Sequence, residues 1–239
     1  MYDAIIVGGG PAGGSAAFFL RQAGWRVLVL DRLSFPRYKP CGGGIAVQAL
    51  RAFPFSFEPV IDSYAERAAY RLGRYAVDMP LPEKSIAMVM RDRFDAFLLS
   101  RSGAEVRTDT GVRALEEAPQ GVTVETEAGE RLLARYVIGA DGSHSTVARA
   151  AGLRRDKWLV PALEAEVIAP PAVFERYQGA PHFFFGEIPK GYLWIFPKRE
   201  HLSVGVAGLR PKRGELQRRL REVMTRAGIE LQGARIHGH

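Results

Sequence analysis

"YDAIIVGGGPAGGSAAFFLRQAGWRVLVLDR", residues 2–32, is the stretch that decides the fold. An apolar run at residues 4–7 predicts a buried strand, and the spacing GxGxxG follows it directly. A helix is expected to about residue 23, and a second apolar strand ends at Asp31. This order of strand, glycine-rich turn, helix and strand is typical of a βαβ unit that binds a dinucleotide.

The residue type at each glycine and at the aspartate of this unit has a physical explanation. Gly8 allows the tight turn, Gly10 lets the backbone approach a pyrophosphate, and Gly13 permits close packing of the helix on the strand. The N-terminus of the helix carries about half a positive charge, which favours a phosphate group. The carboxylate of Asp31 stands where it can accept hydrogen bonds from an adenosine ribose.

The composition limits the classes of protein to which this unit can belong. The chain has 239 residues, 47% hydrophobic and 25% charged, which is typical of a globular protein with one large domain or two smaller ones. The formal net charge is +7, but no aromatic-basic RNA motif or zinc-finger spacing accompanies it, so we expect no nucleic-acid partner. The single cysteine, Cys41, excludes an intramolecular disulfide.

The sequence shows neither a targeting signal nor a metal-binding pattern. It has no run of about 18 apolar residues and no basic leader with a small-residue cleavage site, so we expect a cytoplasmic protein. None of the five histidines pairs with another ligand at metal-binding spacing, so no metal is predicted. The histidines expected to be surface or packing residues are His182, His201, His237 and His239.

Two later stretches distinguish a flavin from a nicotinamide cofactor. The loop RLSFPRYKPCGGGI, residues 32–45, is long, contains two prolines and closes on three glycines. The segment ARYVIGADGSHSTVARAAG, residues 134–152, predicts a buried strand that ends at Asp141 and a helix with serines near its start. A further helix, RDRFDAFLL, begins with Arg91.

Together, the glycine-rich unit, the Asp-Gly segment and the helix that begins with Arg91 resemble the flavin-dependent hydroxylase superfamily. The resemblance implies a mixed α/β fold, in which a Rossmann-like FAD-binding domain is interleaved with an antiparallel β-sheet domain for the substrate. It implies FAD as the cofactor. The residues that it assigns to FAD binding are Gly8, Gly10, Gly13, Asp31, Arg32, Cys41, Gly42, Gly44, Arg91, Val112 and Asp141.

The stretch GYLWIFPKREHLSVGV, residues 191–206, places Tyr192, Trp194 and Phe196 at alternate positions. Alternation with a period of two predicts a strand with one apolar face, and the pattern leaves open whether that face meets the core or a ligand. The stretch is preceded by PRYKPCGGG and continues with a Pro-Lys pair, a spacer of six residues and Gly205. In this combination it is similar to the geranylgeranyl reductase family.

This second resemblance implies FAD-dependent reduction of carbon-carbon double bonds in a polyprenyl chain of a lipid, a quinone or a chlorophyll-type substrate. The aromatic strand would line a tunnel for this isoprenoid, with Tyr192, Trp194 and Phe196 as substrate-binding residues. Cys41 would lie by the flavin as the catalytic residue, because a thiol can donate a proton. NAD(P)H or a ferredoxin would supply electrons. Lys198 is expected to meet an anionic head group or to cap the strand.

Two other functions stay open. Flavin-dependent halogenases carry W-x-W-x-I-P in a related fold, from which YLWIFP differs at Tyr192 and Phe196, and aromatic monooxygenation belongs to the same alternative. The second alternative is an inactive fragment that binds flavin or lipid. It rests on the lack of a Gly-Asp dipeptide, which forms part of a further flavin motif in that superfamily. The resemblance covers about the first two-thirds of a typical member, and the C-terminal third is expected to be missing.

The motifs also suggest how the chain is divided. The expected FAD-binding domain comprises residues 1–74 and 91–155, and the expected substrate domain comprises residues 75–90 and 156–239. A helix is predicted at residues 91–102. Further strands are expected within residues 106–137, with a turn at residues 118–121, and at residues 182–185, 191–196 and 202–207.

The segment RGELQRRLREVMTRAG, residues 213–228, predicts an amphipathic helix with one apolar face and an outer face rich in arginine. Such a helix usually packs its apolar face on its own domain. The alternative is weak peripheral association with an anionic membrane, such as the inner face of the cytoplasmic membrane. The sequence does not predict an oligomeric state.

Overall fold

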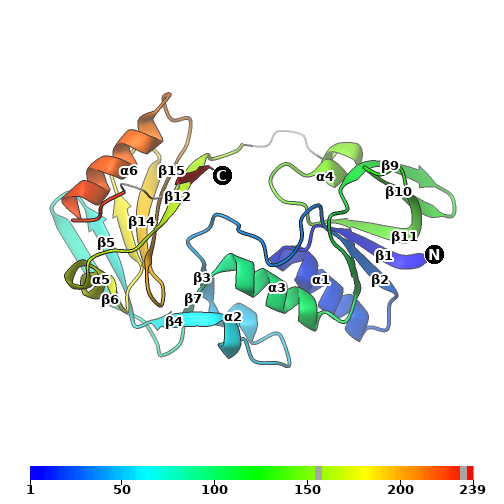
Figure 1. The fold of residues 1–239 in the computed structure, drawn as a ribbon, viewed down its shortest axis with the longest axis horizontal. Helices are drawn as coiled ribbons and strands as arrows, with labels where there is room; N and C mark the ends of the chain where they lie inside the picture. Colours follow the sequence, from blue (N-terminus) through cyan, green and yellow to red (C-terminus); the bar gives the residue numbers. More distant parts are fainter. Residues whose placement is uncertain (154–157, 232–235, 239) are drawn as a thin grey trace. The chain divides into compact units, whose positions relative to one another are not determined.

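The computed structural model describes residues 1–153, 158–231 and 236–238 (Figure 1). It divides into two compact units, each built from two separate segments of the chain. The segments are Met1–Tyr38 and Asp92–Trp158 for unit 1, and Lys39–Arg91 and Leu159–His239 for unit 2.

In the described residues of unit 1, six strands form one sheet in the order β8-β2-β1-β11-β10-β9. The strands are β1 Tyr2–Val7, β2 Val27–Leu30, β8 Glu105–Arg107, β9 Val112–Ala118, β10 Gly121–Thr126 and β11 Arg131–Gly139. Strands β8, β2, β1 and β11 run parallel, whereas β10 and β9 are antiparallel to their neighbours. In the register of the central strand, Ile5 lies opposite Leu28 of β2 and Val137 of β11.

Apolar side chains cover both faces of this sheet, because consecutive residues of β1 point to opposite sides. Ile6 belongs to a cluster that includes side chains of α1 (Pro11–Gln22) and α3 (Arg91–Arg101). Ile5 belongs to a cluster on the other face, which includes a side chain of α4 (Thr146–Ala150). Burial on both faces explains why the N-terminal strand is almost continuously apolar.

The βαβ unit predicted at residues 2–32 is present as β1, α1 and β2. Helix α1 ends at Gln22 and strand β2 at Leu30, each one residue before the predicted end. The helix predicted at residues 91–102 is α3, and the predicted turn at residues 118–121 joins β9 to β10.

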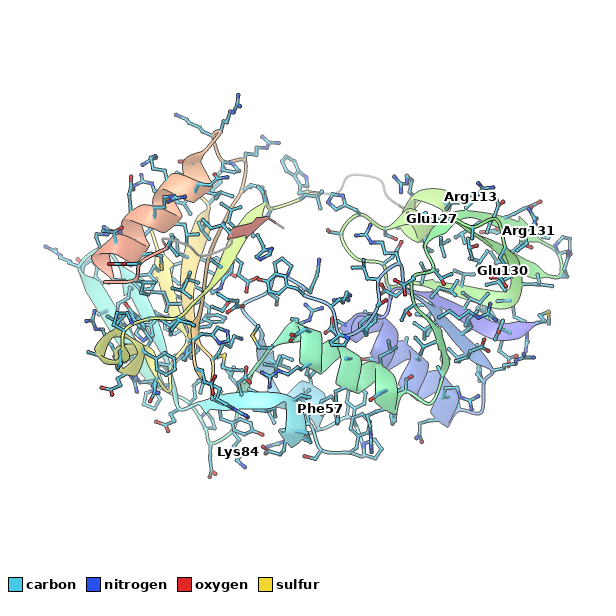
Figure 2. The ribbon with its side chains drawn as sticks, viewed as in Figure 1. Phe57, Lys84, Arg113, Glu127, Glu130 and Arg131 are labelled. Carbon is cyan, nitrogen blue, oxygen red and sulfur yellow. The ribbon has the colours of Figure 1, made fainter. Side chains whose placement is uncertain are left out.

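Arginines on the outer surface of strands β9 to β11 form ion pairs with glutamates on other strands of this group. Arg113 pairs with Glu125 of β10, and Arg131 pairs with Glu116 of β9. Figure 2 shows Arg113 and Arg131 at this end of unit 1. Exposed pairs of this kind each contribute about 0–1 kcal/mol. Part of the positive charge of the chain is therefore neutralised locally.

In the described residues of unit 2, seven strands form a large sheet in the order β16-β12-β15-β14-β13-β5-β6, and three form a small sheet in the order β3-β7-β4. Neighbours are antiparallel except for β5 and β13. The large sheet consists of β5 Arg67–Leu72, β6 Tyr75–Pro80, β12 Ala162–Val167, β13 His182–Phe185, β14 Gly191–Pro197, β15 Leu202–Gly208 and β16 Ile236–Gly238. The small sheet consists of β3 Gly44–Ala46, β4 Ile61–Ala65 and β7 Ile86–Val89.

The two faces of the large sheet carry different side chains. Leu193 and Ile195 of β14 belong to a core cluster with α6 (Glu215–Arg226) and α5 (Pro171–Tyr177). Figure 1 shows α6 lying along this face of the sheet. The aromatic residues that alternate with them in β14, Tyr192, Trp194 and Phe196, point to the opposite face. The remaining short elements of unit 2 are α2 Val47–Leu50 and a 3-10 turn at Glu58–Val60.

The predicted fold class is confirmed, since the structure is a mixed α/β fold with a glycine-rich βαβ motif and a largely antiparallel sheet. The division of the chain differs from the predicted one at residues 39–74, which belong to unit 2. The physical reason is that β5 pairs in parallel with β13, far along the chain. Strand β7, predicted to enter the substrate sheet, joins the small sheet. The predicted boundary at residues 155–156 lies outside the described residues.

Among the histidines, His182 behaves as a packing residue. His182 is buried, with its ring edge-on to Tyr177 at a centroid distance of 4.7 Å. Burial and the positive charge of Arg71 lower the pKa of His182 to about 4. Within the described residues, no three His, Cys, Asp or Glu side chains are grouped to hold a metal ion. The prediction for His239 falls outside the described residues.

Candidate functional site

The glycine-rich turn leaves no space for side chains in unit 1. Gly8 has φ +103°, which favours glycine, and a Cβ there would lie 2.3 Å from the carbonyl oxygen of Ala140. A Cβ on Gly13 would lie 1.8 Å from the carbonyl oxygen of Gly8. Helix α1 begins at Pro11 with Gly10 as its N-cap, and no side chain of the described residues caps it. Its N-terminal N–H groups therefore suit an anion.

Asp31 ties the end of β2 to this turn. Its side chain is buried, and Oδ2 accepts a hydrogen bond from the backbone N–H of Gly9 at 2.7 Å. Oδ1 accepts a second hydrogen bond from the N–H of Leu33 at 2.9 Å. A carboxylate has about four acceptor sites, so two bonds leave capacity for ribose hydroxyl groups. Arg32, the next residue, is exposed.

Asp141 lies against the same turn and orders the start of α4. A Cβ on Gly8 would lie 2.8 Å from the backbone nitrogen of Asp141. The Asp141 carboxylate accepts hydrogen bonds from Ser145 Oγ and from the N–H groups of Thr146 at 2.6 Å and Val147 at 3.3 Å. The structure thus brings the predicted glycine and acidic residues of unit 1 together around one turn.

Val112 and Arg91, two further predicted FAD contacts, lie at the starts of elements. Val112 begins β9, its side chain joins the core of unit 1, and it helps to line a pocket of about 500 Å³ between β9 and α4. Arg91 is the first residue of α3 and is half-buried. Their contact with FAD stays a prediction.

The loop that carries Cys41 packs on the aromatic strand of unit 2. Cys41 is exposed, and its Sγ accepts a weak hydrogen bond from the N–H of Gly43 at 3.4 Å. A Cβ on Gly42 would lie 2.8 Å from the ring of Phe196 and 3.1 Å from Trp194 Nε1. The absence of side chains in this glycine run therefore lets the loop backbone lie directly on the two rings.

The predicted substrate-binding residues belong to a larger aromatic face. The strand pairing places six rings on the side of the large sheet opposite α6, and we call them the aromatic face: Tyr70, Phe183, Phe185, Tyr192, Trp194 and Phe196. The ring of Phe183 lies 5.4 Å from that of Tyr70 and 5.1 Å from that of Phe196. The sequence predicted the strand at residues 182–185 but not these three extra rings. The alternation of Phe183 and Phe185 was the signal.

Gly205 accommodates the ring of Trp194. It lies directly opposite Trp194 in the register of β14 and β15, and a Cβ there would lie 2.1 Å from the indole. Gly205→Ala should therefore displace the indole and cost about 1–3 kcal/mol of unfolding free energy, measured by urea denaturation. The matched control is Gly44→Ala, whose Cβ would lie 3.5 Å from Phe196, an ordinary contact distance. Equal stability of the two variants would contradict this packing.

Lys198 points into unit 2. The residue is 2% exposed, and Nζ donates hydrogen bonds to the carbonyl oxygens of Gly42 at 2.6 Å and Val89 at 2.8 Å. Burial lowers the pKa of Lys198, and the nearby carboxylates of Glu166 and Asp62 oppose that shift. Through these two hydrogen bonds, Lys198 connects the Cys41 loop to β7. Neither sequence-based hypothesis, a head-group contact or a strand cap, describes this role.

Helix α6 packs its apolar face on its own unit, which is the first of the two possibilities that the sequence left open. Its buried side chains are Leu216, Leu220, Val223 and Met224. On the outer face, Arg218 and Arg219 pair with Glu222, and Arg226 pairs with Glu187. Any contact of α6 with a membrane would thus be electrostatic, and it stays a proposal. No helix within the described residues is long and apolar enough to cross a bilayer.

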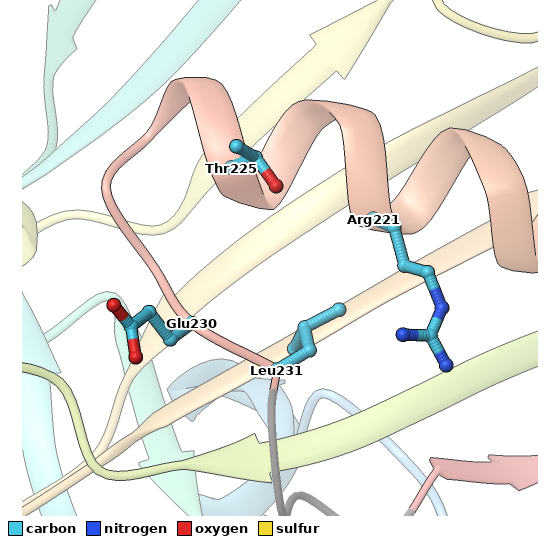
Figure 3. A pocket seen from close by; sticks show the side chains of 4 residues that line it. All are labelled: Arg221, Thr225, Glu230 and Leu231. Atoms are coloured by element: carbon cyan, nitrogen blue, oxygen red, sulfur yellow. The ribbon is translucent and has the colours of Figure 1, made fainter.

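A pocket of about 390 Å³ lies beside the C-terminal half of α6 (Figure 3). It is lined by Arg221, Thr225, Glu230 and Leu231. These side chains include a cation and a carboxylate. They do not form the long apolar wall that a polyprenyl chain needs, whereas the aromatic face does.

Comparison with known proteins agrees with this geometry. A family model described as an FAD binding domain matches residues 1–229. Geranylgeranyl diphosphate reductase of Rhodobacter capsulatus is 34% identical over 218 residues, covering 86% of this chain and 54% of that protein. Digeranylgeranylglycerophospholipid reductase 1 of Methanopyrus kandleri is 34% identical over 232 residues, covering 87% and 58%. The chain therefore spans somewhat more than half the length of these relatives.

Solved structures share the fold. A geranylgeranyl bacteriochlorophyll reductase-like protein from Thermoplasma acidophilum matches with a TM-score of 0.84 and 21% identity, covering 99% of this chain and 66% of that one. The halogenase PltM, in complex with phloroglucinol and FAD, matches with a TM-score of 0.74 and 18% identity, covering 94% and 55%. The chain thus belongs to the FAD binding domain family, and its resemblance to the geranylgeranyl reductases is confirmed by relatives of that name.

Proposed function

We propose that this chain carries the FAD and substrate sites of an enzyme that reduces carbon-carbon double bonds in a polyprenyl chain. The observation that carries the proposal is the packing of the Cys41 loop on Trp194 and Phe196 within unit 2. This packing would hold a thiol that can donate a proton next to an extended apolar wall. The relatives named geranylgeranyl reductase support the same class of substrate.

The residues around the glycine-rich turn fit FAD. A side chain at Gly8 would collide with Ala140 and one at Gly13 with Gly8, so only glycine keeps this turn compact enough for its backbone N–H groups to approach a pyrophosphate. These groups would hold the pyrophosphate and Asp31 the ribose, with Arg32, Arg91, Val112 and Asp141 as further proposed contacts. FAD, when bound, supplies the hydride for the reduction. We propose NAD(P)H or a ferredoxin as the source of its electrons.

The side chains of unit 2 would orient the substrate and supply the proton. The aromatic face would hold the polyprenyl chain and exclude water from the double bond. Cys41 would give its thiol proton to the alkene carbon that does not receive the hydride. Cys41, Gly42 and Gly44 are also proposed to contact FAD, because the glycines add no side chain that would keep the flavin from the loop.

Cys41→Ala should leave FAD bound and lower alkene reduction about 10²–10⁴-fold, the usual contribution of a positioned proton donor. FAD content is measured from the absorbance ratio of the purified protein. Reduction is measured without oxygen, with chemically reduced flavin, as the mass gain of two hydrogens per double bond. Cys41→Ser is the control, since a hydroxyl group keeps a weaker donor in place. Unchanged rates and products in both variants would exclude the proton-donor role.

A second candidate is oxygen-dependent hydroxylation or halogenation of an aromatic substrate. The likeness of the fold to the halogenase PltM favours it. Tyr192 and Phe196, which replace the Trp and Ile of the halogenase motif, oppose it. Incorporation of oxygen or halide by the wild-type protein in air would favour this candidate. Bound FAD without any turnover would instead match a binding fragment.

A further inference from the structure

Two glutamates lie under the Cys41 loop, on the same face of the large sheet as the aromatic residues. Strand β12 contributes Glu164 and Glu166, and in register they lie opposite Gly205 and Ser203 of β15. Glu164 is only 2% exposed. A buried ionised carboxylate is costly unless it is paired, so this position needs a physical explanation.

The contacts of Glu164 lead to Cys41. Ser203 Oγ donates a hydrogen bond to Glu164 Oε1 at 2.8 Å, and the backbone N–H of Cys41 donates to the same carboxyl group. Glu164 Oε2 is buried, and within the described residues no donor group of the protein reaches it. The neighbouring carboxyl of Glu166 is the remaining partner.

Glu166 connects this buried group to the surface. Its Oε2 lies 2.8 Å from Nε2 of His201, but within the described residues no donor forms a hydrogen bond with it, and the two side chains are 21% and 23% exposed. Burial and then the hydrogen bond and charge of Glu166 raise the pKa of Glu164 to about 8. A proton held between the two carboxyls satisfies the orphaned oxygen and removes one of two adjacent negative charges.

Other charged or titratable groups face the pair from the surrounding elements. Lys198, at the end of β14, and Asp62 of β4 interact electrostatically with one another, and Lys198 also interacts with both glutamates. His237 of β16 lies opposite Glu164 in register. Lys198 donates to Gly42 and Val89, and no hydrogen bond from it reaches Glu164 Oε2.

We propose that Glu164 and Glu166 share one proton near neutral pH and return it to Cys41 after each turnover. The relay role rests on the proposed function. In that reaction, the hydride from reduced flavin goes to one alkene carbon and the thiol proton to the other, which leaves a thiolate. The shared proton then moves to Cys41 Sγ, and the carboxylates regain a proton from water through His201. Both glutamates act through Cys41, so they are positioning residues.

The shared proton is tested first in the full chain by infrared titration of carboxyl groups. The wild type should lose a protonated-carboxyl band as the pH rises through about 8, the pKa of Glu164. Glu164→Gln and Glu166→Gln should lack this transition. Glu175→Gln, at an exposed position of α5, should keep it. Two ionised carboxylates at pH 7 in the wild type would overturn the proposal.

The link to Cys41 is tested by alkylation with iodoacetamide, which reports on this residue because it is the only cysteine. Above pH 8, the wild type carries two negative charges near the thiol and Glu164→Gln carries one. The variant should therefore react several-fold faster there, and at the wild-type rate near pH 6.5. A rate ratio that does not change with pH would show a purely structural effect and overturn the link.

Turnover separates this inference from the proposed function. Glu164→Gln should complete its first turnover at the wild-type rate and slow about tenfold in later turnovers, when the thiolate must be reprotonated. Equal slowing of all turnovers would overturn the relay. A wild type that reduces no alkene would overturn the proposed function and its relay, while the infrared titration would still decide whether the proton is shared.

Discussion

Gly13→Ala should yield a protein that fails to retain FAD and unfolds at a lower urea concentration. The new Cβ would lie 1.8 Å from the carbonyl oxygen of Gly8, so α1 has to move away from β1. This movement displaces the helix N-terminus from the phosphate position and opens the core around Ile6. We expect a loss of about 3–5 kcal/mol of unfolding free energy. Flavin content is read from the visible absorbance of the purified protein.

Gly24→Ala is the matched control for this variant. Gly24 lies just after the end of α1 and has φ +82°, but a Cβ there would meet no atom within 4 Å. Only the backbone conformation is then strained, at about 1–2 kcal/mol. FAD content should stay at the wild-type level. If Gly13→Ala and Gly24→Ala lost the same stability and kept the same flavin content, close approach at Gly13 would not be what forms the site.

Lys198→Met should be the most damaging single change in unit 2. It leaves the carbonyl oxygens of Gly42 and Val89 without their donor, and it removes a positive charge that interacts with Glu166 and Asp62. Losing one partner of a buried charged group costs about 3–5 kcal/mol. Urea denaturation measures this loss. Faster amide hydrogen exchange at residues 41–45 should show that the Cys41 loop has been released.

Lys212→Met provides the comparison, because Lys212 is exposed and lies outside the loop contacts. Its unfolding free energy should stay within about 0.5 kcal/mol of the wild type. Wild-type hydrogen exchange at residues 41–45 in Lys198→Met would mean that the loop holds its position without the ammonium group.

Local chemistry explains which parts of the fold were predictable. The turn at Gly8 and Gly13 imposes its geometry through residues adjacent in sequence, so the βαβ unit was found to within a residue or two. The alternation at Tyr192 and Trp194 likewise set the face of β14. The allocation of residues 39–74 was not predictable in this way, since it depends on the pairing of β5 with β13.

The same distinction applies to the site. Glu164 and Glu166 alternate on a strand, a pattern that normally indicates a solvated face, but Glu164 is buried and accepts a hydrogen bond from the backbone of Cys41, far away in sequence. Lys198 was expected to meet a head group or to cap the strand, because its two carbonyl partners come from distant segments of the chain and gave no local signal. Polar side chains whose partners are far away in sequence carry no local signal of their burial.

The assembly of each unit from two separate segments has a consequence during synthesis. Strand β1 leaves the ribosome well before its neighbour β11, in which Ala134 pairs with Tyr2. Strand β5 is likewise synthesised before its partner β13, in which His182 pairs with Ala69. Such distant pairings make folding slow, and the early strands expose unpaired edges until their partners are made. The yield of folded protein in a cell should therefore depend on protection of these nascent strands as well as on the stability of the finished sheets.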